Sequence, residues 1–318
     1  MKPRKVLSLL LVLPITACTQ ESKPLESKLF YFDTSVVTKL YEGEESYLKD
    51  IEEIYKYYDL ASDNYRHRTK ENVLSITETP EQYSKDFYEL LKTSLDVSKE
   101  GAVFFNPLCG SLAKLWKECL AEKKLPTQEQ KQEELNCLSN TELHLEDNYT
   151  IYKVGLAEID LGGIVKGYVL DKVQDYLKSK NVEKYLINAG FSSILLGKKN
   201  SDDGLYTVKI NDLNNTYIKL KDCFLSTSSL SVQGVQIEEG GPIYSHIVNP
   251  MTGEALNFND AVIVVSQKGY LGDALSTSMM MNTVDEIKAI EKEQNVQTIV
   301  VKNKQIIYKN EGLEIFHG

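Results

Sequence analysis

The chain has 318 residues and a formal net charge of −10, with 42% of its residues hydrophobic and 26% charged. A chain of this length can bury a sizeable core in one large domain or two modest ones. The negative charge argues against unaided nucleic-acid binding, because phosphate contacts need a basic surface. It does not exclude a phosphorylated ligand, because a metal ion can neutralise charge locally. We find no internal repeat, which argues against a solenoid.

The first residues have the charge pattern of an export signal. Lys2, Arg4 and Lys5 precede an apolar run over 6–15, which is too short to span a membrane as a stable helix. The run leads into Leu-Pro-Ile-Thr-Ala-Cys18, which resembles the lipobox of bacterial lipoproteins. The sequence therefore predicts export with a lipid anchor on Cys18.

In this interpretation residues 1–17 are a signal peptide and the mature chain begins at Cys18. Residues 18–28 are polar and predict a flexible tether between the membrane and a domain that covers 29–318. The expected location is extracytoplasmic and membrane-anchored. An uncleaved anchor, or a plain secretory signal with an incidental cysteine, is the alternative.

The first part of the domain is predicted to hold one long strand and three helices. Residues 29–41 are rich in aromatic and β-branched side chains, which favour a strand. Apolar residues at helical spacing predict helices over 48–58, 87–95 and 112–120. Residues 122–135 are polar and broken by Pro126, so we interpret them as a surface excursion that is helical only toward its end and carries no chemistry.

The four cysteines after Cys18 show no Cys-x-x-Cys spacing, which argues against a zinc site. They are Cys109, Cys119, Cys137 and Cys223. Outside the cytoplasm they could pair, and Cys109 with Cys119 is one candidate pair. Buried free thiols are the alternative, because the sequence does not fix the connectivity.

The most informative stretch surrounds a pair of glycines. An apolar lead-in over 151–161 ends at Gly162 and Gly163, and a helical pattern follows over 164–177. Paired glycines allow close approach to the backbone, and a helix N-terminus attracts anions. Because an acid, Asp160, and a base, Lys166, flank the pair, the stretch suits a polar, phosphorylated ligand. A tight turn before an ordinary capped helix is the alternative.

The remaining elements alternate irregularly between strands and helices. We predict two strands around a glycine bend over 185–197, further strands over 206–210, 217–220, 223–227, 243–248 and 261–266, helices over 271–281 and 284–293, and a closing hairpin of 298–301 with 305–308. Since no regular βαβ order appears, the expected fold class is α+β, with mixed or antiparallel sheets and packed helices.

Three oxygen-bearing residues gather on the predicted helix over 271–281. Asp273 and Thr277 are four residues apart and therefore share a helix face, and Ser276 adjoins them. A carboxylate and hydroxyls are hard ligands that suit Mg²⁺ better than a softer metal. The alternative for Asp273 is charge stabilisation at a helix N-terminus, which contributes about 0.3–1 kcal/mol.

Several of these stretches together resemble the ApbE family, the FAD:protein FMN transferases. Asp160-Leu-Gly-Gly-Ile-Val-Lys-Gly followed by Asp171 resembles the family signature. His246-Ile-Val-Asn-Pro-Met-Thr-Gly resembles its His-Ile-x-x-Pro-x-Thr-Gly, and Gly272-Asp-Ala-Leu-Ser-Thr resembles its Ala-Asp-Ala-x-Ala-Thr. Leu225-Ser-Thr-Ser-Ser resembles a Ser-Thr-Ser-Gly stretch that precedes the His motif. The motifs keep the family order, so the resemblance implies one catalytic unit of two lobes.

The resemblance also implies a Mg²⁺ site and a catalytic base. The implied ligands are the Asp273 carboxylate, the Thr277 hydroxyl and the Gly163 carbonyl, with Ser276 as an adjoining oxygen ligand, and Asp273 counts as catalytic through the metal. His246 is the candidate base, because the unperturbed pKa of histidine lies near neutral pH. A structural histidine at a strand end is the alternative.

The resemblance further implies which residues bind FAD, the substrate. Tyr65 would stack on the flavin, with a plain surface tyrosine as the alternative. Phe32 would lie near the flavin or belong to the core, and Asn106 stands where many members carry Asp, so it can hydrogen bond but brings no charge. The implied FAD-binding residues are Phe32, Tyr65, Asn106, Asp160, Lys166 and Ile247.

The implied reaction passes the FMN phosphoryl group of FAD to a Ser or Thr hydroxyl of an exported partner flavoprotein and releases AMP. Two other functions stay open. An FAD pyrophosphatase would use the same metal ligands but give the phosphoryl group to water. A flavin-binding lipoprotein without catalysis would also carry this family resemblance, and Asn106 with the weakly matching N-terminal third leaves room for it.

Overall fold

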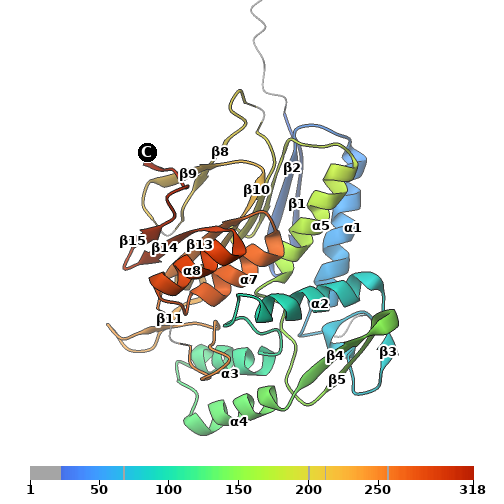
Figure 1. The fold of residues 1–318 in the computed structure, drawn as a ribbon, viewed down its shortest axis with the longest axis vertical. Coiled ribbons are helices and arrows are strands. Elements are labelled where there is room, and N and C mark those ends of the chain that lie inside the picture. The colour runs from blue at the N-terminus through green and yellow to red at the C-terminus, as the bar shows by residue number, and fades with distance from the viewer. Residues whose placement is uncertain (1–22, 67–68, 200, 212, 256–257) are drawn as a thin grey trace, which may run out of the picture.

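The computed structural model describes residues 23–318 except 67–68, 200, 212 and 256–257 (Figure 1). Its largest element is an eight-stranded sheet in which every neighbouring pair is antiparallel. The strands in spatial order are β1 Leu25–Tyr31, β2 Thr34–Leu40, β6 Tyr185–Ala189, β7 Ser193–Leu196, β10 Cys223–Ser229, β13 Ala261–Ser266, β14 Gln297–Lys302 and β15 Gln305–Lys309.

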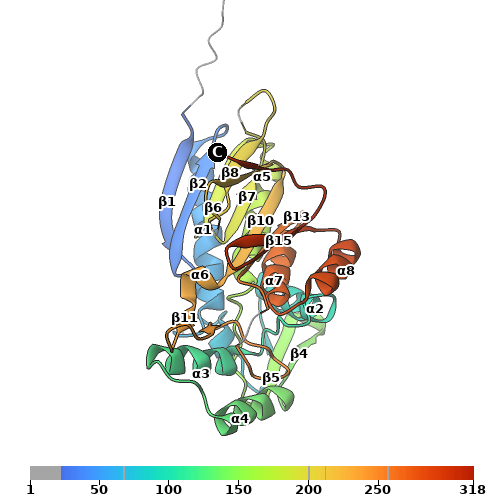
Figure 2. The same ribbon diagram turned by 90° about the vertical axis from the view of Figure 1, so that its left-hand side faces the viewer.

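The two faces of this sheet are covered by different layers. Helices pack on one face (Figures 1 and 2), namely α1 Glu45–Ser62, α5 Val165–Ser179, α7 Gly269–Met279 and α8 Val284–Gln294. A three-stranded antiparallel sheet packs on the other face, in the order β16 Ile315–His317, β9 Thr216–Leu220 and β8 Tyr206–Lys209. The fold is therefore α+β, as the sequence predicted.

Strand β13 shows why the large sheet sits between two layers. Successive side chains of a strand point to opposite faces. Val262 and Val264 join the core on the helical side, whereas Ile263 and Val265 join the core under the small sheet. A continuous apolar run is what a strand buried on both faces requires.

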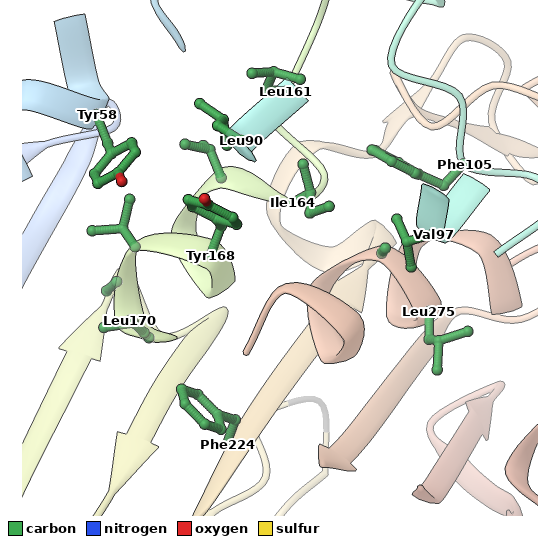
Figure 3. Close-up of a cluster of buried hydrophobic side chains, with 14 of the residues drawn as sticks. Tyr58, Leu90, Val97, Phe105, Leu161, Ile164, Tyr168, Leu170, Phe224 and Leu275 are labelled. Carbon is green, nitrogen blue, oxygen red and sulfur yellow. The ribbon is translucent and has the colours of Figure 1, made fainter. Parts of the chain in front are cut away.

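A second lobe lies beyond one end of the large sheet (Figure 1). It contains α2 Lys85–Lys99, α3 Gly110–Ala121 and α4 Gln128–Ser139, with a small antiparallel sheet of β3 Glu81–Gln82, β5 Thr150–Val154 and β4 Glu142–Glu146. The shorter elements are α6 Leu230–Gln233, β11 Val235–Gln236, β12 Ile243–Tyr244 and 3₁₀ turns at Val73–Ser75 and Asp147–Tyr149. Figure 3 shows Leu90 and Val97 of α2 in one apolar cluster with Ile164, Tyr168 and Leu275, which joins the lobes through a shared core.

The predicted strand over 29–41 is wrong, because the chain reverses direction within it. Phe32 and Asp33 have positive φ angles, 53° and 54°, and form the turn between β1 and β2. The first strand also begins at Leu25, inside the predicted tether, so residues 25–28 are part of the sheet. The predicted signal peptide over 1–17 and Cys18 lie outside the described residues.

The prediction that 122–135 is helical only toward its end is confirmed. Helix α4 begins at Gln128, and Thr127 with Gln130 forms a capping box at its start. Lys131 of this helix is buried and forms an ion pair with Glu254 at 2.5 Å, so the segment supports another part of the fold.

Two further predictions about single elements are settled by the structure. The predicted strand over 243–248 shrinks to the two residues of β12. Cys109, Cys119, Cys137 and Cys223 are free thiols, so the candidate Cys109–Cys119 disulfide is absent from the described structure.

No helix in the described part of the chain is both long and apolar enough to cross a membrane.

Candidate active site

A cavity of about 840 Å³ opens where the large sheet meets the second lobe. This volume lies in the usual range for a cofactor or small-ligand site. All but one of the predicted catalytic, ligand-binding and metal-binding residues line it, namely Phe32, Asn106, Asp160, Gly163, Lys166, His246, Ile247, Asp273, Ser276 and Thr277. The exception is Tyr65. The fold therefore brings residues from five separate stretches of the chain to one place.

Asp273 is a buried carboxylate held by groups from three elements. Its oxygens accept hydrogen bonds from the Gly167 amide at 2.7 Å and from the Ser226 hydroxyl at 2.6 Å. The Ser193 hydroxyl lies 2.8 and 3.0 Å from the two oxygens and is shared between them. Burial raises the pKa of Asp273, although Lys166 and these donors oppose the shift. The site therefore holds a carboxylate whose position is fixed before any ligand arrives.

Helices α5 and α7 approach each other closely because both carry a glycine at the crossing. A Cβ added to Gly167 would lie 2.1 Å from the carbonyl oxygen of Gly269, and one added to Gly269 would lie 2.3 Å from that of Gly167. Asp171 accepts hydrogen bonds from the amides of Gly269 at 3.0 Å and Tyr270 at 2.9 Å, at the first turn of α7. Burial raises the pKa of Asp171 to about 6, although these two bonds oppose the shift. Gly167 and Asp171 thus place α7, and with it Asp273.

Thr277 and Gly163 lie beside each other at the same end of the cavity. A Cβ built on Gly163 would be 3.3 Å from the Thr277 hydroxyl oxygen. That hydroxyl also lies 3.3 Å from the Ser228 hydroxyl. The Ser276 hydroxyl donates to the carbonyl of Asp273 at 3.0 Å inside the helix and lies 3.0 Å from the Ser228 hydroxyl.

The donors that gather here are oxygen atoms. Among the described residues, no three His, Cys, Asp or Glu side chains come together in a way that could hold a metal ion. One carboxylate with a hydroxyl and a main-chain carbonyl is instead a set of hard ligands, which suits Mg²⁺ with water or substrate oxygens completing its coordination. The chemistry of Asp273, Thr277 and Gly163 is thus compatible with the ion implied by the motifs.

His246 lies in the segment that follows β12 and is partly buried against the cavity. Burial lowers the pKa of His246 to about 4, with Lys117 and Lys166 adding to the shift and Asp160 opposing it. The imidazole is therefore neutral at pH 7 and has a nitrogen free to accept a proton.

The turn that follows His246 is held by the second lobe. The Trp116 indole of α3 donates to the Gly253 carbonyl at 2.8 Å, and Lys131 of α4 is paired with Glu254. Within the turn, the Asn249 amide donates to the Glu254 carbonyl at 2.7 Å. Because side chains of α3 and α4 bond to this turn, the second lobe fixes the position of the His246 segment beside the cavity.

Asp160 and Lys166 are placed by the glycine turn between them. The Asp160 carboxylate accepts from the Gly162 amide at 2.7 Å, and the Lys166 ammonium lies 3.5 Å from the Gly162 carbonyl. Asn106 uses its side-chain oxygen locally, accepting from the Leu108 amide at 2.9 Å. Lys166 lines the cavity, and within the described part of the chain its ammonium makes only this one long contact.

The two aromatic residues predicted near the flavin differ in position. Phe32 lines the cavity, and its amide donates to Asp59 at 2.6 Å, which secures the turn between β1 and β2. Tyr65 is 61% exposed, and its side chain contributes nothing to the cavity wall. The Tyr65 hydroxyl instead accepts a 2.9 Å hydrogen bond from Lys117, which does line the cavity.

Lys117, Ser193 and Ser226 are site residues that sequence reasoning missed. Burial would lower the pKa of Lys117, but its hydrogen bond to Tyr65 and the nearby Asp160 carboxylate outweigh burial and raise that pKa. Lys117 is thus a second cation in the cavity. The only feature of the sequence that could have identified Lys117 is its position on the polar side of α3, next to Trp116. A surface lysine can occupy the same kind of position.

A buried carboxylate, a neutral imidazole and two lysines line one cavity, and its two cations suit an anionic ligand such as a phosphate group. The model of one protein family, the ApbE family, matches residues 32–300. Because the match covers most of its length, the chain belongs to the ApbE family.

Individual relatives agree with this assignment. The chain is 27% identical over 293 residues to the FAD:protein FMN transferase of Klebsiella pneumoniae, covering 86% of this chain and 87% of that protein. It is 24% identical over 324 residues to the enzyme of the same name from Haemophilus influenzae, covering 93% and 91%.

Solved structures share the fold. The flavin transferase ApbE from Vibrio cholerae has a TM-score of 0.73 at 20% identity, covering 93% of this chain and 97% of that chain. The ApbE protein from Thermotoga maritima gives the same values. The flavinyl transferase ApbE from Pseudomonas stutzeri, in its apo form, has a TM-score of 0.74 at 18% identity, covering 91% and 95%.

Proposed function

We propose that this protein transfers the FMN moiety of FAD to a hydroxyl group of a partner protein and releases AMP. Membership of the ApbE family supports the proposal, as does the name FAD:protein FMN transferase that its curated relatives carry. The observation that carries it is the convergence of Asp273, Thr277 and Lys166 on one cavity. A fixed carboxylate, a hydroxyl and a cation in one place suit the transfer of a phosphoryl group.

In this reaction a Ser or Thr hydroxyl oxygen attacks the phosphorus of the FMN half of FAD. The bond to the bridging oxygen of the pyrophosphate breaks, and AMP leaves with that oxygen. The hydroxyl proton passes to a base, for which neutral His246 is the candidate. Proton removal by a positioned side chain contributes typically about 10²–10⁴-fold in rate.

The residues for a Mg²⁺ ion are the Asp273 carboxylate, the Thr277 hydroxyl and the Gly163 carbonyl. When bound, the ion would neutralise charge on the pyrophosphate. The Ser193 hydroxyl lies within hydrogen-bond distance of both Asp273 oxygens. It can therefore stay bonded to one oxygen while the other oxygen coordinates a cation. Lys166 and Lys117 would add positive charge around the phosphates, and the adjoining Ser276 hydroxyl would offer a further oxygen ligand.

We also propose that the protein works outside the cytoplasm as a membrane-anchored lipoprotein, with the anchor on Cys18. The export pattern before Cys18 supports this location, and the acceptor would then be an exported flavoprotein with a Thr- or Ser-containing motif. Strand β1 begins at Leu25, so the connecting residues reach at most about 25 Å from the anchor. The catalytic domain would therefore work close to the membrane surface.

The test combines the chain from Thr19 with FAD, Mg²⁺ and a candidate acceptor domain. We would measure the intact mass of the acceptor and the AMP released in the same tube. A Mg²⁺-dependent gain of one FMN supports the transferase. If AMP is released while two different acceptors stay unmodified, the protein is a pyrophosphatase and not a transferase. If FAD binds but neither the mass gain nor AMP release is seen, the protein is a flavin-binding protein without catalysis. Growth with labelled fatty acid, comparing Cys18→Ala with the wild type, tests the anchor.

A further inference from the structure

An unpaired strand edge borders the catalytic cavity. In the small sheet, β8 has β9 as its neighbour on one side and no strand among the described residues on the other. An exposed edge of this kind presents unpaired main-chain groups to which another chain can bind. Because proteins usually protect such edges, an open one beside a reaction site calls for a physical explanation.

The register shows which groups point outward from this edge. The Ile210 amide donates to the Thr216 carbonyl at 2.9 Å, on the side of β9. Since hydrogen-bonded positions alternate along an antiparallel pair, Val208 also bonds toward β9. The amides and carbonyls of Thr207 and Lys209 therefore point away from β9, and both residues are exposed.

This edge belongs to the wall of the cavity that holds Asp273 and His246. The consecutive residues from Thr207 to Asn211 all line it. Side chains of a strand alternate between two faces, so one face would contribute only every second residue. An uninterrupted run means that the main-chain edge of the strand itself borders the cavity.

The hollow is larger than one cofactor needs. A second cavity of about 790 Å³ adjoins the first, and Asn211 and Ser231 line both. Each volume alone falls within the range of about 300–1,000 Å³ that a single ligand site occupies. Space beyond the FAD site therefore continues along the end of β8, where a further chain segment can lie.

We propose that the acceptor protein binds as an added strand on the free edge of β8, through the main-chain groups of Thr207 and Lys209. This inference rests on the proposed function, because it assigns the place of the protein that receives FMN. An added strand gains its affinity from main-chain hydrogen bonds and presents alternate side chains to each face. The segment carrying the acceptor hydroxyl would thus enter the cavity in an extended conformation.

The test removes one outward amide at a time. Thr207→Pro and Lys209→Pro each delete a donor from the free edge, where proline is tolerated, and leave the amides that bond to β9. Thr207→Val and Lys209→Ala are the matched controls, because they change the side chain and keep the amide. Each variant's unfolding midpoint is compared with that of the wild type.

We expect each proline variant to raise the KM for the acceptor at least tenfold, with the FAD dissociation constant within twofold of the wild type. The control variants should stay within about threefold for both. Proline variants with an unchanged acceptor KM would overturn the inference. So would controls that lose as much as the proline variants, because the side chains would then carry the binding.

A second measurement keeps the inference testable if the proline variants unfold. Amide hydrogen exchange of the wild type, with and without acceptor, should show at least tenfold slower exchange at Thr207 and Lys209 when the acceptor is bound. No slowing would overturn the inference. A wild-type chain that transfers no FMN to any acceptor would refute the proposed function itself, whereas transfer without protection of these amides would refute only the docking on β8.

Discussion

The amide of Gly167 donates a 2.7 Å hydrogen bond to the carboxylate of Asp273, across 106 residues of sequence. This bond joins the glycine-rich motif at the start of α5 to the acidic motif of α7. It forms because neither Gly167 nor Gly269 has a side chain where the two helices cross. The glycine after Lys166 is therefore needed for packing, and the candidate metal ligand depends on it.

Gly167→Ala should disrupt both stability and the site. Its Cβ would lie 2.1 Å from the Gly269 carbonyl oxygen and 2.9 Å from the Asp273 carboxyl carbon, so the helices must separate. We expect the free energy of unfolding to fall by about 1–3 kcal/mol, the usual cost of overpacking. AMP release should be lost along with it. Urea unfolding and an AMP assay measure the two effects.

Gly163→Ala is the matched control for this substitution. Its Cβ would lie 3.2 Å from the Phe105 ring and 3.3 Å from the Thr277 hydroxyl, contacts that small shifts relieve. We expect the free energy of unfolding to stay near that of the wild type, so the two variants are compared on stability and not on turnover. If both variants behave alike, the close approach of α5 and α7 does not explain the Gly167 requirement.

Asp273→Ala should abolish AMP release, while FAD binding weakens but persists through the rest of the cavity. The substitution removes the only carboxylate of the proposed Mg²⁺ site and leaves the Gly167 amide and two serine hydroxyls without their acceptor. FAD binding by fluorescence and AMP release across a Mg²⁺ titration measure the two effects. Asp175→Asn, at an exposed position of α5, should leave both unchanged. Unchanged turnover in Asp273→Ala would refute the metal assignment.

His246→Gln should lower the transfer rate by about 10²–10⁴-fold, with little change in FAD affinity, if the imidazole is the base. Because burial lowers its pKa to about 4, the neutral form is present above pH 4 and is lost as the pH falls through that value. The profile of kcat/KM for wild type should therefore show no histidine inflection near pH 6.5. An inflection there that disappears in the variant would contradict this environment. His144→Gln is the control, because His144 stacks on Tyr152 of β5, far from the cavity motifs in the fold.

The sequence predicted those parts of the site that lie within short motifs. Asp273 and Thr277 are one helical turn apart, and Asp160 and Lys166 flank one turn, so local spacing revealed them. The Ser193 and Ser226 hydroxyls donate to Asp273 from strands that are 80 and 47 residues away in the sequence. Residue spacing within a short motif cannot predict contacts between such distant segments. Lys117 was missed for the same reason.

The error over residues 29–41 has a different cause. A two-residue hairpin turn needs positive φ angles, which glycine and asparagine usually supply. Here Phe32 takes one of them, and its amide is held by Asp59 from α1, 27 residues away. A tertiary contact thus replaces the usual turn residue. For 122–135, hydrophobicity gave little signal because the buried contact of α4 is an ion pair, Lys131 with Glu254.

Asp171 should make stability depend on pH in the direction opposite to an ordinary ion-paired acid. The side chain is only 8% exposed, and burial raises its pKa from 3.8 to about 6, although the amides of Gly269 and Tyr270 donate to it. A pKa that is higher in the folded state means that the folded chain binds the proton more tightly. This contribution to stability is therefore fully present below pH 4 and is lost as the pH rises through about 6.

The comparison that isolates this effect is wild type against Asp171→Asn, which cannot titrate. Other groups contribute equally to both, so the difference between their free energies of unfolding should change with pH. From pH 7.5 to pH 4.5 we expect it to shift by about 2 kcal/mol in favour of the wild type, measured by urea unfolding. A difference that stays constant over this range would mean that the two amides of α7 hold the pKa of Asp171 near its ordinary value. The N-terminus of α7 would then stabilise the charged carboxylate more strongly than its burial destabilises it.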